Sequence, residues 1–365
     1  MNNHQASKII VMPKSSISEK IKLQMAGQRP FVLYSNFNKN TIKALLQTNA
    51  KSYQSSRFNE SGFVFAPFNL KKQLTYLIPE SVSEALEFNL KSKSTSFLSS
   101  QNSKSNAEVH KNLIKKAIQF IQEKTLEKVV LARTAEIEFL NINVLELFYS
   151  VVKAYPEAYT YFWFHPKTGI WMGASPESLI KIEGHELQSA ALAGTQRFKG
   201  STEVKWDVKN FEEQAIVTNY LKRTLNPHLE FVNTSKPKTI RAGKLLHLQT
   251  LLSGTLKATP NGFKALLNDV HPTPAVCGTP KKAAMAFINE YELIDRSYYS
   301  GFLGEIRHHS NPKLQYANLV VNLRCMQIDR NTAKLYSGGG ITEKSNPDNE
   351  WEETEAKIQT LKSVF

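Results

Sequence analysis

The chain of 365 residues has only two cysteines, Cys277 and Cys325, and no long hydrophobic run. Two cysteines cannot build the disulfide framework of a small secreted protein, so a pair of reduced thiols is expected. No stretch approaches the roughly 18 consecutive apolar residues of a membrane-spanning helix. The apolar run at residues 9–12 is too short for the core of a signal peptide. We therefore expect a cytoplasmic protein with no membrane partner.

Acidic residues are fewer than basic ones: the chain has 32 Asp and Glu against 46 Lys and Arg, which gives a net charge of +14. Such an excess fits nucleic acid, an anionic surface, small anionic substrates or merely a lysine-rich surface. The lysines are scattered and form no block of five or six adjacent basic residues, which weakens the nucleic-acid interpretation. The hydrophobic fraction of 41% is too high for a disordered chain and is ordinary for a packed core.

The order of predicted elements indicates the fold class. Residues 90–106 (LKSKSTSFLSSQNSKSN) are rich in Ser, Lys and Asn, which is typical of an exposed linker. Strands are predicted in pairs, at 159–164 with 171–174, at 179–182 with 187–192, and at 319–328 with 332–338. Helices are predicted after the linker and at 209–225, 262–267, 281–291 and 347–364. Hairpins interspersed with helices favour an α+β fold with mixed, layered sheets over a regular βαβ array.

The last predicted helix carries the clearest candidate site. Asn346 is a plausible N-cap and Pro347 fits the first helical position. Glu350, Glu353 and Lys357 then share one face of the helix. Two carboxylates one turn apart can coordinate Mg²⁺, and the lysine can hold a substrate carboxylate. The same pattern also suits a solvated face with weak Glu–Lys pairing.

Three further residues combine charge with an apolar setting. Lys128 begins the apolar run KVVLA, where burial favours the neutral amine and can free it as a base, although an edge-strand lysine is the alternative. Glu177 follows Pro176 at the end of a strand, where a turn either aims it into a cleft or leaves it on the surface. Arg324 lies within a predicted strand at 319–326, and a buried arginine requires a carboxylate partner or a ligand.

Two other features bear on ligand binding. Glu212 and Glu213 interrupt the apolar pattern of the helix at 209–225 and are either exposed or ligands. Ser337 is followed by three adjacent glycines, whose amides can approach an anion closely. A tight turn from a strand to the last helix is the alternative there.

Taken in order, nine segments resemble the chorismate-utilising enzymes. That family comprises isochorismate synthases, salicylate synthases, anthranilate synthase large subunits and aminodeoxychorismate synthases. The segments are KVVLAR at 128, GASPES at 173, ALAGT at 191, LLHLQTLLSG at 245, HPTPAVCGTP at 271, DRSYYSGFLG at 295, VNLR at 321, SGGGI at 337 and EWEETEAK at 350.

The resemblance implies a fold and a domain organisation. The family's fold consists of large, mostly antiparallel layered sheets with flanking helices, as in the anthranilate synthase large subunit. The segments place the catalytic domain at residues 105–365, and residues 1–104 match the variable N-terminal portion by position only. We expect residues 1–104 to pack on the same fold.

The resemblance also implies roles for individual residues. Lys128 resembles the general base that acts on water, and Glu177 the general acid that protonates the departing 4-hydroxyl. Glu213 and Glu353 resemble the two Mg²⁺ ligands, with Glu350 acting through a water molecule. The residues expected to bind substrate are Arg324, Lys357, Tyr299, Thr195, Ala275 and the amides of Gly338 and Gly339.

Two positions depart from the family pattern. Asn210 stands where many relatives have an acidic residue, one turn before the expected metal ligand. Gln214 directly follows that ligand and replaces a residue that is commonly His. Both changes can alter metal binding indirectly, although Glu213 itself is present.

Three positions distinguish the branches of the family. Lys128 favours water as nucleophile, because anthranilate synthases use ammonia and usually lack this lysine. Ala193 stands where aminodeoxychorismate synthases carry a nucleophilic lysine, and Ala275 where salicylate synthases tend to have a threonine. Each position points to isochorismate synthase.

The expected activity is the Mg²⁺-dependent conversion of chorismate to isochorismate, by addition of water at C2 and loss of the C4 hydroxyl. The product would serve menaquinone or siderophore biosynthesis. We expect a monomer that needs no glutamine amidotransferase subunit and no nucleic acid. The alternative is a salicylate synthase, which goes on to eliminate pyruvate.

Overall fold

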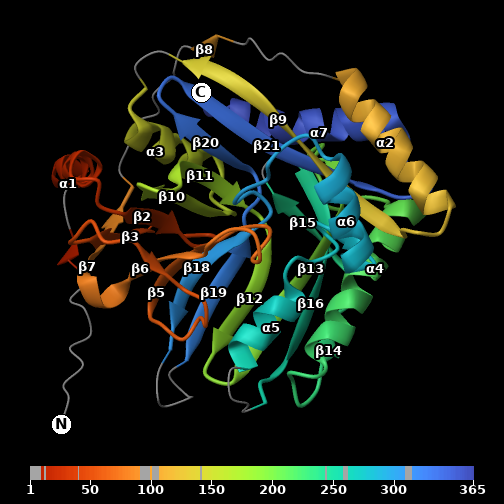
Figure 1. The fold of residues 1–365 in the computed structure, drawn as a ribbon, viewed down its shortest axis with the longest axis horizontal. Coiled ribbons are helices and arrows are strands. Elements are labelled where there is room, and N and C mark those ends of the chain that lie inside the picture. The colour runs from red at the N-terminus through yellow and green to blue at the C-terminus, as the bar shows by residue number, and fades with distance from the viewer. Residues whose placement is uncertain are drawn as a thin grey trace.

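The computed structural model describes residues 10–11, 14–39, 41–90, 99–100, 107–139, 142–242, 245–257, 262–308 and 315–365. The predicted linker at 90–106 lies outside these residues, apart from Leu90 and residues 99–100. The described residues form two large sheets that pack face to face, with helices on their outer sides (Figure 1).

The first sheet has eleven strands in the described part of the chain, and only β1 and β7 pair in parallel there. Its strands, in spatial order, are β1 (Ile10–Val11), β7 (Ser83–Asn89), β3 (Thr41–Gln47), β2 (Phe31–Ser35), β10 (Tyr159–His165), β11 (Gly169–Ser175), β20 (Cys325–Asp329), β21 (Thr332–Ile341), β9 (Lys128–Phe139) and β17 (Gly278–Thr279), with β8 (Ser99–Ser100) beside β9.

The second sheet has ten strands in the same described residues and is antiparallel. Its strands, in spatial order, are β14 (Asn233–Thr234), β16 (Leu245–Thr255), β13 (Glu186–Arg197), β12 (Ser178–Glu183), β19 (Tyr316–Val321), β18 (Phe302–Arg307), β5 (Gly62–Ala66), β6 (Tyr76–Pro79) and β4 (Tyr53–Gln54), with β15 (Lys238–Ala242) beside β16.

The helices cover the outer faces of both sheets. The first sheet packs against α1 (Lys14–Ala26), α3 (Val144–Ala154) and α7 (Pro347–Lys362). The second packs against α4 (Val208–Leu225) and α5 (Gly262–Val270). A smaller apolar cluster joins β9 to α2 (Ala107–Gln122) and α6 (Lys281–Tyr291). A short 3₁₀ helix, Glu80–Val82, precedes β7.

Strand β10 illustrates why the layers form. Successive side chains of a strand point to opposite faces of the sheet. Tyr161 and Trp163 therefore face the cluster between the two sheets, where Trp163 stacks on Phe65 with ring centroids 4.9 Å apart. Phe162 and Phe164 face the cluster beneath the helices. Both faces are buried, which is why this strand has a continuous run of large apolar residues.

Much of the predicted arrangement is confirmed. The class is a layered α+β fold with mostly antiparallel sheets, and two of the three predicted strand pairs, β10–β11 and β12–β13, are present as hairpins. Helix α6 has the predicted bounds, and α7 begins behind the Asn346 cap as expected. The boundary at residue 104 stays a prediction. The strands β2 and β5 that precede it each pair with later strands of the chain.

One expectation about strands was wrong, and one of the alternatives left open by the sequence is excluded. Residues 319–328 are not one strand, because the chain leaves β19 in the second sheet and enters β20 in the first. Arg324 therefore lies in the linker between the sheets and not inside a strand. Residues 337–340 do not form a turn, since they lie within β21 and pair with β9.

A second linker makes the same crossing in the opposite direction. The chain passes from β11 in the first sheet to β12 in the second, and Glu177 lies between these strands. Because β11 pairs with β20 and β12 with β19, the two linkers are neighbours in space. Ala174 N–H donates to the carbonyl of Arg324, and Val321 N–H donates to the carbonyl of Glu177, both at 3.0 Å.

Cys277 and Cys325 are both buried free thiols, as expected. No helix in the described part of the chain is long and apolar enough to cross a membrane.

Candidate active site

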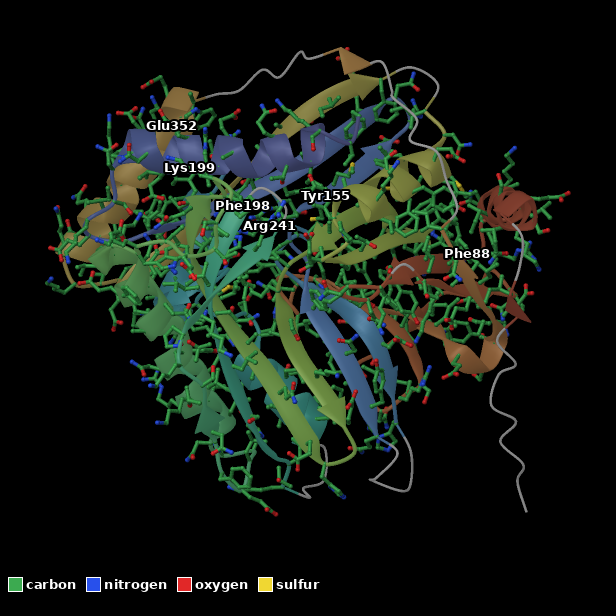
Figure 2. The ribbon with its side chains drawn as sticks, turned by 180° about the vertical axis from the view of Figure 1, so that it is seen from behind. Phe88, Tyr155, Phe198, Lys199, Arg241 and Glu352 are labelled. Atoms are coloured by element: carbon green, nitrogen blue, oxygen red, sulfur yellow. The ribbon has the colours of Figure 1, made fainter. Side chains whose placement is uncertain are left out.

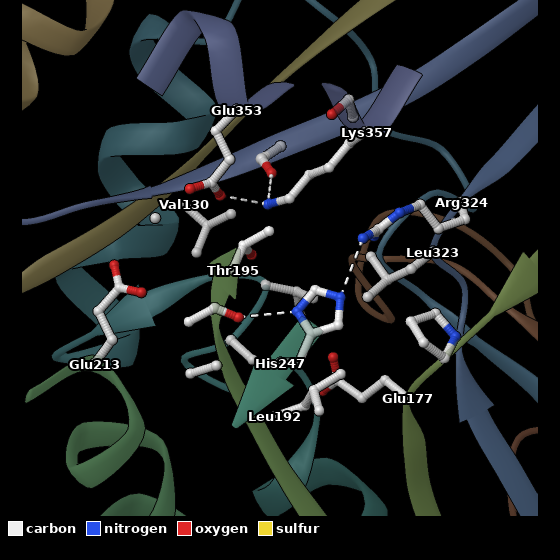
Figure 3. A pocket seen from close by; sticks show the side chains of 18 of the residues that line it. Val130, Glu177, Leu192, Thr195, Glu213, His247, Leu323, Arg324, Glu353 and Lys357 are labelled. Carbon is white, nitrogen blue, oxygen red and sulfur yellow. Dashed lines mark hydrogen bonds and ion pairs between the residues drawn. The ribbon is translucent and has the colours of Figure 1, made fainter. Parts of the chain in front are cut away.

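A single pocket collects most of the residues that the sequence singled out (Figure 3). It lies where β9 and β21 of the first sheet meet β13 and β16 of the second, beside the two linkers and under α4 and α7. The predicted residues that line it are Lys128, Glu177, Thr195, Glu213, Ala275, Tyr299, Arg324, Gly338, Glu353 and Lys357. Gly339 and Glu350 are not among the lining residues.

Lys128 is buried at the start of β9, with 2% of its surface exposed. It shares one corner of the pocket with Glu213 because the facing residue, Gly340, has no side chain. A Cβ at Gly340 would lie 2.8 Å from Lys128 Cε and 3.1 Å from Glu213 Oε1. The last glycine of the SGGG run therefore makes room for these two side chains.

Glu177 is buried on the linker after β11, and its backbone N–H is bound by Ser175 Oγ at 3.2 Å. Burial raises the pKa of the Glu177 carboxyl to about 8, although the positive charges of Lys128, Arg324 and Lys357 act to lower it. The carboxyl is therefore largely protonated near neutral pH, which is the state required of a proton donor.

His247 of β16 also lines the pocket, and the sequence reasoning gave it no role. Burial, followed by the charge of Arg324, lowers the pKa of His247 to about 3, so the imidazole is neutral. Its Nδ1 lies 2.9 Å from the carbonyl of Gly194, which can only accept, so Nδ1 carries the hydrogen. Nε2 then accepts from Arg324 Nη2 at 3.4 Å. In the sequence, His247 is the one titratable side chain within the largely apolar motif LLHLQTLLSG, and this contrast could have indicated a site residue.

Arg324 takes a left-handed backbone conformation, with φ of +47°. Non-glycine residues rarely adopt this region. The sharp bend carries the chain from β19 to β20 and brings the guanidinium toward His247 (Figure 3).

Helix α7 contributes a carboxylate and an amine to the pocket. Lys357 Nζ donates to Glu353 Oε1 at 2.7 Å and to the carbonyl of Gly338 at 2.9 Å. Burial acts to raise the pKa of Glu353, but the adjacent Lys357 outweighs it, so the pKa lies below its usual value. Glu353 is thus a carboxylate at neutral pH.

Glu350 lies one turn earlier on α7 and is buried, with 2% of its surface exposed. Its Oε1 accepts from Ser345 Oγ at 2.7 Å and from Lys209 Nζ at 2.5 Å. Its Oε2 is buried without a hydrogen-bond partner. Burial and the nearby charge of Glu353 raise the pKa of Glu350.

These carboxylates suit a hard cation. Glu213 and Glu353 offer oxygen ligands at the pocket, and Glu350 Oε2 is an unsatisfied acceptor behind them. In the described ranges, no group of three or more His, Cys, Asp or Glu side chains could by itself hold a metal ion. Mg²⁺ commonly takes only one or two protein carboxylates and completes its shell with water and substrate oxygens. The residues present therefore fit Mg²⁺.

The glycines of β21 alternate between two environments. A Cβ at Gly338 would lie 2.9 Å from the hydroxyl of Tyr299. A Cβ at Gly339 would instead face α7, 3.5 Å from Thr354 Cγ2 and 3.6 Å from Glu350 Oε2. Gly339 thus faces the helix, while its two neighbours line the pocket.

Asn210 and Gln214 attach α4 to the second sheet. Asn210 Oδ1 accepts from the backbone N–H of Thr195 at 3.2 Å. Gln214 Nε2 donates to the carbonyl of Ala191 at 3.1 Å and to Thr250 Oγ1 at 2.9 Å. Neither residue lines the pocket. Both hold α4, the helix that carries Glu213, against strands of the second sheet.

The segment that follows Thr195 is fixed at the edge of the second sheet. The guanidinium of Arg241 on β15 lies over the ring of Phe198, 4.0 Å from its centroid (Figure 2). This contact ties the end of β13 to its neighbours.

Helix α7 is held against β9 by Arg133, another residue to which the sequence reasoning gave no role. Arg133 Nε donates to Thr354 Oγ1 at 2.7 Å, and its Nη2 forms an ion pair with Glu355. The guanidinium carbon lies 3.8 Å from the centroid of the Trp351 ring. Three contacts spread over one turn fix the rotation of α7, and with it the direction of Glu353 and Lys357.

Comparison with known proteins gives consistent matches. Residues 63–365 match the model of a family described as "Chorismate binding enzyme". The vibriobactin-specific isochorismate synthase of Vibrio cholerae is 30% identical over 334 residues, which are 88% of this chain and 82% of that protein. Isochorismate synthase MenF of Escherichia coli is 28% identical over 262 residues, 69% of this chain and 59% of that protein.

A similar fold occurs among solved structures. A putative 2,3-dihydroxybenzoate-specific isochorismate synthase, DhbC from Bacillus anthracis, superposes with a TM-score of 0.79 at 24% identity. The superposition covers 95% of this chain and 99% of that one.

Proposed function

Because the chain belongs to the family of chorismate binding enzymes, we propose that it is an isochorismate synthase, an isomerase that converts chorismate to isochorismate. The observation that carries the proposal is that Lys128 and Glu177 line the same pocket, next to carboxylates and cationic side chains. The product serves siderophore or menaquinone biosynthesis, and relatives of both kinds match the chain.

The substrate is a dicarboxylate, and the pocket presents matching cations. Arg324 and Lys357 bind its carboxylates, helped by the hydroxyl of Tyr299 and the amides near Gly338. His247 orients the guanidinium of Arg324 through Nε2. Thr195 and Ala275 complete the walls of the pocket.

The reaction needs a base and an acid. Lys128 acts as the general base and takes a proton from the water that adds at C2. Glu177, protonated because of its burial, donates a proton to the C4 hydroxyl as it leaves and the ring double bonds shift. One water molecule is consumed and one is released, so substrate and product are isomers.

The pocket residues that would hold Mg²⁺ are Glu213 and Glu353, with Glu350 contributing through water. A cation held by these carboxylates would supply Lewis-acid polarisation of the bound substrate. We further propose that the enzyme works in the cytoplasm as a monomer, without a glutamine amidotransferase subunit.

The salicylate synthase alternative is not favoured. Relatives among the matches are named isochorismate synthases, and Ala275 at the pocket wall offers no hydroxyl to hold an enolpyruvyl group.

One assay tests the proposal. Purified enzyme is incubated with chorismate and Mg²⁺, the products are separated by chromatography, and pyruvate is measured with lactate dehydrogenase. We expect isochorismate without pyruvate. Stoichiometric pyruvate and salicylate would identify a salicylate synthase instead, and unchanged chorismate would overturn the proposal. Lys128→Met, which keeps the length of the side chain and removes the amine, serves as the inactive control.

A further inference from the structure

Lys209 bridges the two helices that carry the proposed metal ligands. It lies on α4, one turn before Glu213, and its side chain is 28% exposed. Its Nζ reaches across to α7 and lies 2.5 Å from Glu350 Oε1. The ammonium group therefore sits between a carboxylate of α7 and the helix that carries Glu213.

The surroundings of this amine are strongly acidic. Glu350 is almost fully buried and receives one other hydrogen bond, from Ser345, while its Oε2 has no partner. Glu353, one turn further on, is paired with Lys357. The negative charges of Glu350 and Glu353 repel each other in this partly desolvated site. Without a cation between α4 and α7, the buried Glu350 carboxylate would be poorly compensated.

We propose that Lys209 is a built-in counter-ion of the metal site, which neutralises Glu350 before the metal binds and opposes binding of the divalent cation. The inference rests on the proposed function, in that it takes Glu213 and Glu353 as Mg²⁺ ligands. Lys209 is a positioning residue under this proposal. Its positive charge holds α4 against α7 in the metal-free protein and repels the incoming Mg²⁺.

Replacement of the amine should therefore raise the affinity for Mg²⁺ and lower the stability of the metal-free protein. Loss of a merely structural lysine would instead lower both. Lys209→Met keeps most of the side-chain volume and removes the charge. We expect this variant to bind Mg²⁺ about tenfold more tightly, because a like charge beside the site is removed. We also expect metal-free Lys209→Met to unfold at a lower temperature than the wild type, with the difference lost in saturating Mg²⁺.

Isothermal titration with Mg²⁺ and thermal unfolding with and without Mg²⁺ measure both effects, and neither requires turnover. Lys344→Met is the matched control, because Lys344 pairs with Glu212 of the same helix at 2.9 Å but both partners are exposed. That variant should bind Mg²⁺ like the wild type. Lys209→Arg keeps the charge and should do the same, which provides a folded comparison if the methionine variant is unstable.

Each result has a distinct meaning. Unchanged or weaker Mg²⁺ binding by Lys209→Met, with normal binding by the wild type, would overturn the counter-ion role alone. Tighter binding by Lys209→Arg would also overturn it, since the charge is retained. If the wild type binds no Mg²⁺ at all, the metal site of the proposed function fails instead.

Discussion

Glu177 and Arg324 lie on adjacent linkers that carry the chain between the two sheets in opposite directions. The linkers are hydrogen-bonded to each other, through Val321 N–H to the Glu177 carbonyl and Ala174 N–H to the Arg324 carbonyl. A carboxyl and a guanidinium far apart in the sequence are therefore fixed relative to each other by one backbone unit. Four strands anchor this unit, which gives the pocket a rigid wall.

The first prediction concerns the pH dependence of catalysis. Burial raises the pKa of Glu177 to about 8, and the proposed acid is active only when protonated. We expect kcat/KM to fall about tenfold per pH unit above roughly pH 8. Glu177→Gln should lower kcat by about 10²- to 10⁴-fold and abolish this alkaline limb. A pH–rate profile checks both, and an identical limb in the residual activity of the variant would contradict the assignment.

The second prediction concerns stability and follows from the same carboxyl. Its pKa in the folded protein, about 8, lies above the unfolded value of about 4.3, so the folded state binds more protons between these pH values. The contribution of Glu177 to stability therefore decreases as pH rises from about 4 to about 8. We expect Glu177→Gln to be more stable than the wild type at pH 8 and equal to it at pH 4. Urea unfolding at the two pH values measures the difference, and a variant less stable at pH 8 would refute it.

The third prediction compares two neighbouring glycines. Gly340→Ala puts a methyl group 2.8 Å from Lys128 Cε, so the amine must move and activity should fall at least about tenfold. Gly339→Ala faces α7, where the nearest atom is 3.5 Å away, and should retain most of the activity. Steady-state kinetics of the pair test the assignment. Equal losses in both variants would mean that Lys128 is not the sensitive group.

The fourth prediction concerns the metal. Glu353→Gln removes a pocket carboxylate while keeping its shape, and the Mg²⁺ concentration for half-maximal activity should rise at least about tenfold. Glu352→Gln is the control, because Glu352 is exposed on the same helix (Figure 2). A Mg²⁺ titration that leaves Glu353→Gln unchanged would argue against this site.

The fifth prediction tests the attachment of α7. Arg133→Met removes the contacts to Thr354 and Glu355 and should lower the stability by about 1–3 kcal/mol, since a buried guanidinium that holds α7 through polar contacts is lost. The requirement for Mg²⁺ should rise as α7 loosens. Lys111→Met breaks an exposed contact to Asp348 of the same helix and should change neither quantity. Thermal unfolding and a Mg²⁺ titration of both variants distinguish the two positions.

Local chemistry made several features readable from the sequence. The Asn346 cap and Pro347 predict the start of α7. The helical periodicity of α7 then puts Glu350, Glu353 and Lys357 on one face of the helix. The turn between β10 and β11 predicts a hairpin, which is present. Such features can be predicted from the sequence because they depend on residues close together along the chain.

Other features depend on long-range contacts. Strand β10 has a continuous aromatic run at residues 161–164 and no period of two in hydrophobicity, since both of its faces are buried. The sequence cannot tell which layer will cover each face. The break at residues 322–324 was missed because both flanking strands are apolar, although they enter different sheets. For the run at 337–340 the sequence left a turn open as an alternative, yet β9 pairs with it and the strand continues to Ile341.

The candidate site divides in the same way. Its residue types and their order along the chain were sufficient to name Lys128, Glu177, Glu213, Arg324 and Glu353 as candidates, through the resemblance of their motifs; their roles remain proposals. The contacts that His247, Lys209 and Arg133 make with other elements became visible only in three dimensions.

The sequence by itself thus determined the family, the helix caps and the hairpins, because short-range geometry and residue chemistry suffice for these. Only the tertiary structure decided that one pocket contains the acid, the amine and the carboxylates, that Gly339 faces away from it and that Glu350 is bound by Lys209. The physical reason is that burial and charge pairing depend on neighbours supplied by distant segments, here two sheets and two helices.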